Sequence, residues 1–109
     1  MNGRYAPSPT GVLHLGNLRT ALLAWLFARS QGAPFLVRID DLDHGRVRPG
    51  IAEQQLADLA ALGLGWDGPV VRQSERMEAY VEAIVRLDAG GALYPCFCTR
   101  AEIRQAASA

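Results

Sequence analysis

RYAPSPTGVLHLGN, residues 4–17, decides the fold of this chain. It begins as the end of a short strand, over residues 4–6, and turns at a Pro-Ser-Pro sequence followed by Thr-Gly. An apolar-His-apolar-Gly run comes next, and a helical pattern then extends from about residue 16 to residue 30, where Gly32 and Pro34 stop it. A strand, a glycine-containing turn and a helix make the usual nucleotide-binding corner of an α/β sheet.

His14 and Gly16 stand where this helix begins. The free N–H groups and the partial positive charge of a helix N-terminus favour phosphate. Gly16 has no side chain, so a ligand can lie close to its backbone, and His14 can donate a hydrogen bond to a phosphate oxygen. A His-x-Gly pair alone is better explained by packing and turn formation. Its combination with Arg4 and the Pro-Ser-Pro turn within fourteen residues favours a phosphate site.

The rest of the chain alternates between strands and helices. PFLVRID, residues 34–40, predicts a strand with one apolar face and with Leu36, Arg38 and Asp40 on the other. Further helices are expected over residues 51–62, from an N-cap at Ser74 and from a capping box of Thr99 and Glu102, with a brief strand at residues 70–71 and an extended segment over residues 92–98. The alternation predicts an α/β fold with a parallel sheet. The apolar positions Leu18, Leu22, Trp25 and Leu26 of the first helix fall on one face, and this face is expected to lack some of its partners around Leu22 in this chain alone.

Composition excludes several classes of protein. The chain has 109 residues, half of them hydrophobic and 20% charged, with a formal net charge of zero. A net charge of zero argues against a domain that binds nucleic acid through its overall charge, but it does not exclude a local basic patch. No apolar run approaches the ~20 residues that span a bilayer and no signal-peptide pattern is present, so a cytoplasmic location without membrane contact is expected.

Five ordered motifs resemble one family. They are RYAPSPTGVLHLGNLRTALLAWLFAR, VRIDDLD, LGLGWDGP, RQSER and YPCFCTRAEI. Together they resemble the N-terminal part of the class I glutamyl-tRNA synthetases and their relatives, with His14-Leu15-Gly16-Asn17 as a variant of the "HIGH" signature. The resemblance implies a Rossmann-like parallel sheet. Residues 1–93 would be the first half of the nucleotide-binding catalytic domain, and residues 94–109 would begin a Cys-x-Cys, zinc-type insertion.

The family has two close branches. Full glutamyl-tRNA synthetases charge tRNA(Glu), and a shorter branch, the glutamyl-queuosine tRNA(Asp) synthetases, attaches glutamate to the queuosine base in the anticodon loop. The Val-Arg-Pro-Gly sequence after the acidic loop and the WDGPV and CFCTR runs favour the shorter branch. Its members activate glutamate with ATP and transfer it to tRNA, so the implied partners are glutamate, ATP with Mg²⁺, and tRNA.

The resemblance also assigns site residues. His14, Gly16 and Asn17 would hold the ATP phosphates and serve catalysis, while Arg4, Ala6, Ser8 and Asp40 would bind glutamate. Arg4 offers a planar fork suited to a carboxylate, and Asp40 would take the substrate ammonium. The family has Glu where this chain has Asp40, so the reach is one methylene shorter. An ordinary surface ion pair is the competing explanation for Arg4 and Asp40.

The sequence gives only a weak signal for a metal site. Cys96 and Cys98 are separated by one residue, so a disulfide between them would be strained, and they could instead form half of a tetrahedral zinc site. Two free thiols are an equal alternative. Asp41 and Asp43 are expected to cap the acidic loop and the next helix rather than to bind a metal, because magnesium would arrive with ATP.

Two rival functions come from other classes. A helix begins at Thr99 and the chain stops at residue 109, so the sequence is expected to be the first part of a longer protein and to be inactive alone. A non-catalytic nucleotide-binding fragment is therefore one rival. A small-molecule nucleotidyltransferase with the same His-x-Gly corner is the other, and it gives RYAPSP and RIDDLD no role.

Overall fold

The computed structural model describes residues 1–108 and divides into two compact units, Met1–Met77 and the residues from Glu78 onward. The first unit contains β1 (Gly3–Tyr5), α1 (Leu15–Ser30), β2 (Phe35–Ile39), α2 (Ile51–Ala61), β3 (Val71–Arg72) and the short 3-10 helix η1 (Gln73–Arg76). Helix α3 (Met77–Ala89) starts at the boundary, and α4 (Arg100–Ala107) lies in the second unit. No helix among the described residues is long and apolar enough to cross a membrane.

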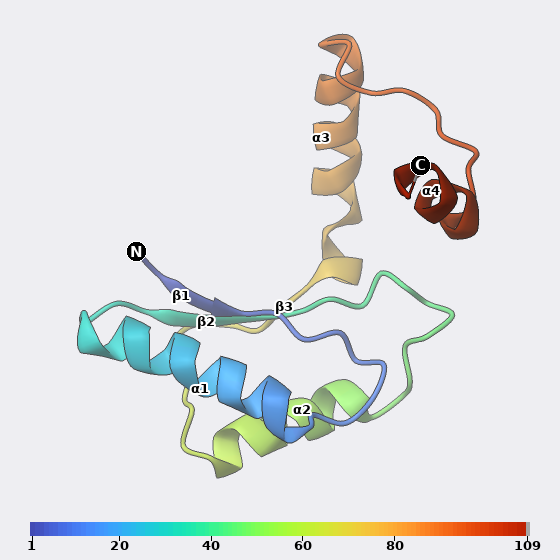
Figure 1. Cartoon of the computed structure of the whole chain (residues 1–109). Helices are drawn as coiled ribbons and strands as arrows, with labels where there is room; N and C mark the ends of the chain where they lie inside the picture. The colour runs from blue at the N-terminus through green and yellow to red at the C-terminus, as the bar shows by residue number, and fades with distance from the viewer. Residues whose placement is uncertain (109) are drawn as a thin grey trace. The chain divides into compact units, whose positions relative to one another are not determined.

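The three strands form one parallel sheet in the order β1-β2-β3. Arg4 is paired with Leu36 across the first pair of strands, and Arg38 with Val71 across the second. Each parallel pair is joined by a helix, α1 or α2, as parallel strands require. Figure 1 shows both helices on the same side of the sheet. The predicted α/β fold with a parallel sheet is confirmed, including the faces of the central strand.

The core lies between the sheet and the two helices. Phe35, Val37 and Ile39 of β2 are buried toward the helices, while Leu36 and Arg38 face the other way and are more exposed. Ala21 and Ala28 of α1 and Leu59 of α2 complete the buried layer, which comprises Ala21, Ala28, Phe35, Val37, Leu59 and Leu64.

The apolar face of α1 is only partly buried, and the expected exposure around Leu22 is confirmed. Leu18 and Trp25 pack against the core, but Leu22 and Leu26 are 41% and 48% exposed. The fully buried positions are small ones, Ala21 and Ala28. A small side chain is favoured at Ala28 because β1 lies very close to α1 there. A leucine at this contact would push the strand away.

Trp25 and Arg29 tie α1 to the turn that follows α2. The Trp25 indole N–H and the Arg29 guanidinium both donate to the backbone oxygen of Gly65. Arg29 also pairs with Asp67 at 2.6 Å, and Asp67 accepts the backbone N–H of Phe35. The Phe35 hydrogen bond, followed by that from Arg29, lowers the pKa of Asp67 below its ordinary value. The LGLGWDGP motif therefore fixes α1, α2 and β2 against one another.

The prediction that Ser74 is the N-cap of the third helix is wrong. Residues 73–76 form η1 ahead of α3, and the Ser74 side chain donates to Asp41 instead of capping a helix. In the second unit the capping box of Thr99 and Glu102 is confirmed, and hydrogen bonds from the Thr99 backbone and side chain lower the pKa of Glu102. Residues 92–99 form neither helix nor strand, so the expected extended segment makes no sheet pairing in the described chain.

Candidate functional site

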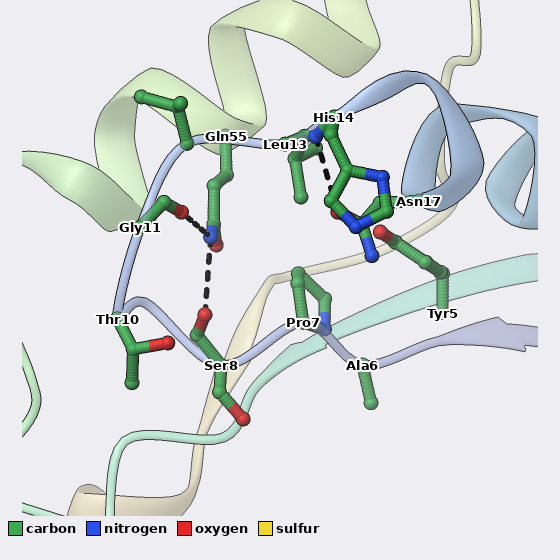
Figure 2. Close-up of a pocket in the computed structure, with 11 residues that line it drawn as sticks. Tyr5, Ala6, Pro7, Ser8, Thr10, Gly11, Leu13, His14, Asn17 and Gln55 are labelled. Carbon is green, nitrogen blue, oxygen red and sulfur yellow. Dashed lines mark hydrogen bonds between the residues drawn. The ribbon is translucent and has the colours of Figure 1, made fainter.

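A cavity of about 450 Å³ opens where β1 ends and α1 begins. Its volume is within the range of small-molecule sites. Figure 2 shows its walls: the strand end, the Pro-Ser-Pro loop, the first turn of α1 and one side chain from α2. The lining residues are Tyr5, Ala6, Pro7, Ser8, Thr10, Gly11, Val12, Leu13, His14, Asn17 and Gln55. The cavity therefore contains four of the residues that the sequence motifs nominated, namely Ala6, Ser8, His14 and Asn17.

His14 is the N-cap residue of α1 and is exposed to the cavity. Its Nδ1 accepts the backbone N–H of Gly16 at 3.1 Å. A nitrogen that accepts carries no proton, so in the neutral ring the proton lies on Nε2, which is left to donate outward. The local chain geometry thus selects the tautomer that a phosphate oxygen would require.

Asn17 completes the start of the helix from the other side. Its Oδ1 accepts the backbone N–H of His14 at 3.1 Å (Figure 2). The first turn of α1 contains no acidic residue. A helix N-terminus without a carboxylate keeps its partial positive charge for an incoming anion. The predicted pairing of a histidine with a helix start is therefore realised in the geometry.

Gly16 does not line the cavity itself. A Cβ built on it would lie 2.9 Å from Cε1 and 3.1 Å from Nδ1 of His14. The glycine at this place is needed so that the imidazole can rest on the helix start. The sequence suggested that the missing side chain admits a ligand, and the structure adds that it admits the histidine ring.

Arg4 and Asp40 are not among the residues that line the cavity. Arg4 is paired in register with Leu36, so it shares the sheet face of Arg38 and Asp40, away from the helices. Asp40 receives Arg38 on both carboxylate oxygens, at 2.6 and 3.1 Å. The surface ion pair considered from the sequence therefore exists, but Arg38 rather than Arg4 is the partner of Asp40.

Asp41 has a structural partner instead of a loop-capping role. It is 8% exposed and accepts both the hydroxyl and the backbone N–H of Ser74, at 2.6 and 2.9 Å. Burial by itself raises its pKa. The Ser74 hydrogen bonds, the backbone and the charge of Arg72 together outweigh burial, so the pKa of Asp41 lies below its ordinary value. The expectation that Asp41 and Asp43 cap the loop and the next helix is wrong for the helix, because the N-cap of α2 is Gly50 and no side chain among residues 1–108 caps it. Asp43 accepts the backbone N–H groups of Arg46 and Val47 only through its own backbone carbonyl.

Tyr5 and Gln55 are cavity residues that the sequence motifs did not nominate. Tyr5 is half-buried at the end of β1, and burial raises the pKa of its hydroxyl. Gln55 occupies the buried stripe of α2 with Ala52 and Leu59. A polar residue within an apolar helical stripe is a signal that could have singled out Gln55.

Metal ligands do not gather in the described part of the chain. Cys96 and Cys98 are free and exposed thiols. No group of three or more His, Cys, Asp or Glu side chains that could hold a metal occurs among residues 1–108. Tetrahedral zinc takes four ligands, so the cysteine pair does not by itself make a zinc site.

Comparisons with known proteins point the same way as the cavity. The family described as "tRNA synthetases class I (E and Q), catalytic domain" matches residues 1–109. Two similar curated proteins are named glutamyl-Q tRNA(Asp) synthetase. One, from Nocardia farcinica, is 66% identical over 98% of this chain and 34% of its own length. The other, from Cutibacterium acnes, is 62% identical over 98% of this chain and 30% of its own.

Solved structures give the same fold at lower identity. The crystal structure of a glutamate tRNA ligase from Elizabethkingia meningosepticum, in complex with its amino acid, superimposes with a TM-score of 0.78 at 36% identity. The match covers 98% of this chain and 23% of that one. The chain thus spans about a third of the length of the curated relatives that it matches.

Proposed function

This chain belongs to the class I tRNA synthetases for glutamate and glutamine, and from that premise we propose that its full-length protein activates glutamate with ATP and transfers it to the queuosine base of tRNA(Asp). The observation that carries the proposal is the cavity at the start of α1, where His14 and Asn17 meet the loop that bears Ser8. The names and the identities of 52–66% of the most similar relatives support the choice of nucleic-acid substrate.

The first step would join glutamate to AMP. A glutamate carboxylate oxygen attacks the α-phosphorus of ATP, the bond to the β,γ-phosphates breaks, and pyrophosphate leaves. The role of this part of the chain would be to position groups and to stabilise charge. His14 would donate from Nε2 to a phosphate oxygen, and the N-terminus of α1 would face the same negative charge. Magnesium would arrive with ATP.

Glutamate would lie on the strand side of the site. The Ser8 hydroxyl lies on the side of the turn away from Gln55 (Figure 2), and Arg4 would offer a guanidinium at the sheet face away from the helices. Asp40 would take the substrate ammonium while Arg38 holds its carboxylate in place. These assignments rest on the motifs, and their support is that Arg4 and Asp40 share one face of adjoining strands.

The second step would transfer the glutamyl group. A hydroxyl oxygen of queuosine attacks the glutamyl carbonyl carbon, and AMP leaves. The acceptor, the start of a Cys-x-Cys insertion after residue 93, zinc at Cys96 and Cys98, and a cytoplasmic location all stay predictions. The described residues supply two of the four ligands that zinc would need, so no step is assigned to zinc.

The test has two parts, both on the full-length gene product. Glutamate-dependent ATP–pyrophosphate exchange, with a panel of amino acids, should give activity with glutamate only. Transfer of labelled glutamate should then occur to tRNA(Asp) that contains queuosine, and not to the same tRNA without queuosine. Charging of tRNA(Glu) would instead establish the second candidate, a glutamyl-tRNA synthetase, which the 36% identity to solved glutamate tRNA ligases supports. ATP binding without exchange would establish a non-catalytic module.

A further inference from the structure

Gln55 is a buried polar side chain with an unusual set of partners. It is 1% exposed, on the apolar stripe of α2. Its amide Nε2 donates to the backbone oxygen of Ser8 at 3.1 Å and to that of Gly11 at 2.7 Å. Its Oε1 is buried without a hydrogen-bond partner in the described part of the chain. The amide nitrogen makes two hydrogen bonds to the loop and the amide oxygen makes none. The side chain therefore contributes through its donors to the loop.

The orientation of this amide follows from its neighbours. Turning the amide over would place Oε1 against two carbonyl oxygens, where no hydrogen bond can form. The donors therefore face the loop. Figure 2 shows the side chain reaching down from α2 to Ser8 on one side and Gly11 on the other.

The loop that Gln55 contacts, residues 7–11, is not part of a strand and so has no pairing within the sheet. Backbone N–H groups of Asp40 and Arg48 donate to Pro7 and Pro9, both at 3.0 Å. Gln55 donates to the carbonyl oxygens of Ser8, which also accepts the Thr10 N–H, and of Gly11, from more than forty residues away in the sequence. A turn of this composition, with two prolines that cannot donate, depends on donors from elsewhere in the chain.

This loop also forms the wall of the cavity that carries Ser8. We propose that Gln55 is a positioning residue for the amino-acid substrate: its amide clamps the Ser8–Gly11 turn, and the clamp sets where the Ser8 hydroxyl stands, on the far side of the turn from Gln55 (Figure 2). The proposal deepens the proposed function and rests on it for the identity of the substrate. In this proposal Gln55 acts through the loop and is assigned no contact with either reactant.

The matched pair of variants is Gln55→Met and Gln54→Met. Methionine has the length and flexibility of glutamine and donates no hydrogen bond. Gln54 is the adjacent residue, exposed, and its amide donates within the helix to Asp58. The two variants thus share the substitution and differ in whether the loop loses its clamp. Gln55→Met also removes the unpartnered Oε1, which favours folding of the variant.

The first readout is steady-state exchange by the full-length protein. Gln55→Met should raise the glutamate KM by about tenfold and leave the ATP KM within about twofold, because only the amino-acid wall of the cavity is released. Gln54→Met should change neither. A merely structural role would lower the melting temperature and leave both KM values alone, and that result would overturn the proposal. Gln55→Asn, whose amide is one methylene too short to span both carbonyls, should shift the glutamate KM in the same direction if Gln55→Met does not fold.

The second readout does not need activity. Hydrogen exchange at the Thr10 amide, which donates to Ser8 within the turn, should be faster by about fivefold or more in Gln55→Met than in Gln54→Met. Unchanged exchange at this amide would overturn the clamp. If the wild-type protein lacks glutamate-dependent pyrophosphate exchange, the proposed function fails, and the hydrogen-exchange comparison still decides whether Gln55 holds the loop.

Discussion

The imidazole of His14 rests on the backbone of Gly16. Nδ1 accepts the Gly16 N–H at 3.1 Å, and a methyl group added to Gly16 would come within 2.9 Å of the ring. The two residues therefore act together: Gly16 leaves room for the His14 ring, and the ring caps the helix. Because Nδ1 is used for the cap, the opposite edge of the ring faces the cavity as the donor.

Gly16→Ala should separate stability from activity. Alanine is a better helix former than glycine by about 1 kcal/mol, which offsets the cap that the displaced His14 ring gives up, so the melting temperature should change little. The new Cβ would displace the His14 ring, and exchange activity should fall by about tenfold or more. The measurement is kcat/KM for exchange beside thermal unfolding. Gly65→Ala is the control, since a Cβ there meets nothing within 4 Å. Loss of activity in proportion to loss of folded protein would contradict this account.

His14→Asn tests the two edges of the ring separately. Asparagine is among the best N-cap residues, so the helix start should remain intact, whereas the outward donor of Nε2 is lost. Exchange should fall by about 100-fold, the range for removing a hydrogen bond made in the transition state. His14→Ala should lose both the cap and the activity. A His14→Asn enzyme within about threefold of wild type would remove the phosphate role from His14.

The sequence predicted the strands and helices well because their signals are local. Alternation along residues 35–39 identified both faces of β2, and the capping box at Thr99 located the start of α4. The fully buried positions of α1 were not predicted, because tertiary contact decides them. Periodicity ranks leucines above alanines, but β1 comes so close to α1 that a small residue is needed at Ala28.

Within the candidate site, too, local sequence signals could be predicted and long-range contacts could not. His14, Asn17 and Ser8, which line the cavity, could be nominated from the sequence because they lie within one short motif. Gln55 could not be, because its role depends on a contact to a loop more than forty residues away. Asp41 was assigned to the wrong partner for the same reason, since its contact with Ser74 spans 33 residues. Roles carried by long-range hydrogen bonds have no fixed spacing that a motif can record.

Arg4→Met should act on one substrate only. If the guanidinium binds the substrate carboxylate, the glutamate KM should rise by about tenfold or more while the ATP KM stays nearly constant. Arg86→Met is the matched control, because Arg86 is exposed on α3 and, among residues 1–108, forms its ion pair within the same helix, with Glu82. Equal changes in both KM values would indicate a folding role for Arg4 instead.

Asp41→Asn should destabilise the protein in a pH-dependent way. Loss of the charged acceptor weakens both hydrogen bonds from Ser74, at a cost of about 1–3 kcal/mol at neutral pH. The folded-state pKa of Asp41 is lowered, so its contribution is complete above the ordinary carboxyl pKa and is lost as pH falls through the lowered value. The difference in free energy of unfolding between wild type and variant should therefore narrow below about pH 5. A difference that is constant down to pH 3 would show that charge at Asp41 is not the cause.

Gly3→Ala should destabilise the first unit. A Cβ on Gly3 would lie 2.7 Å from the Cβ of Ala28 and 2.9 Å from the backbone oxygen of Ala24, so β1 and α1 would have to move apart. Overpacking of this kind costs about 1–3 kcal/mol and should lower the melting temperature in thermal unfolding.

The double variant Gly3→Ala with Ala28→Gly identifies the contact that matters. Removing the Ala28 methyl group relieves the 2.7 Å contact, but the backbone oxygen of Ala24 stays 2.9 Å from the new Cβ. Glycine within α1 also costs the helix about 1 kcal/mol. The second substitution should therefore give no rescue in thermal unfolding. Full recovery of the melting temperature would mean that the Ala28 side chain, and not the closeness of the two backbones, is what requires glycine at position 3.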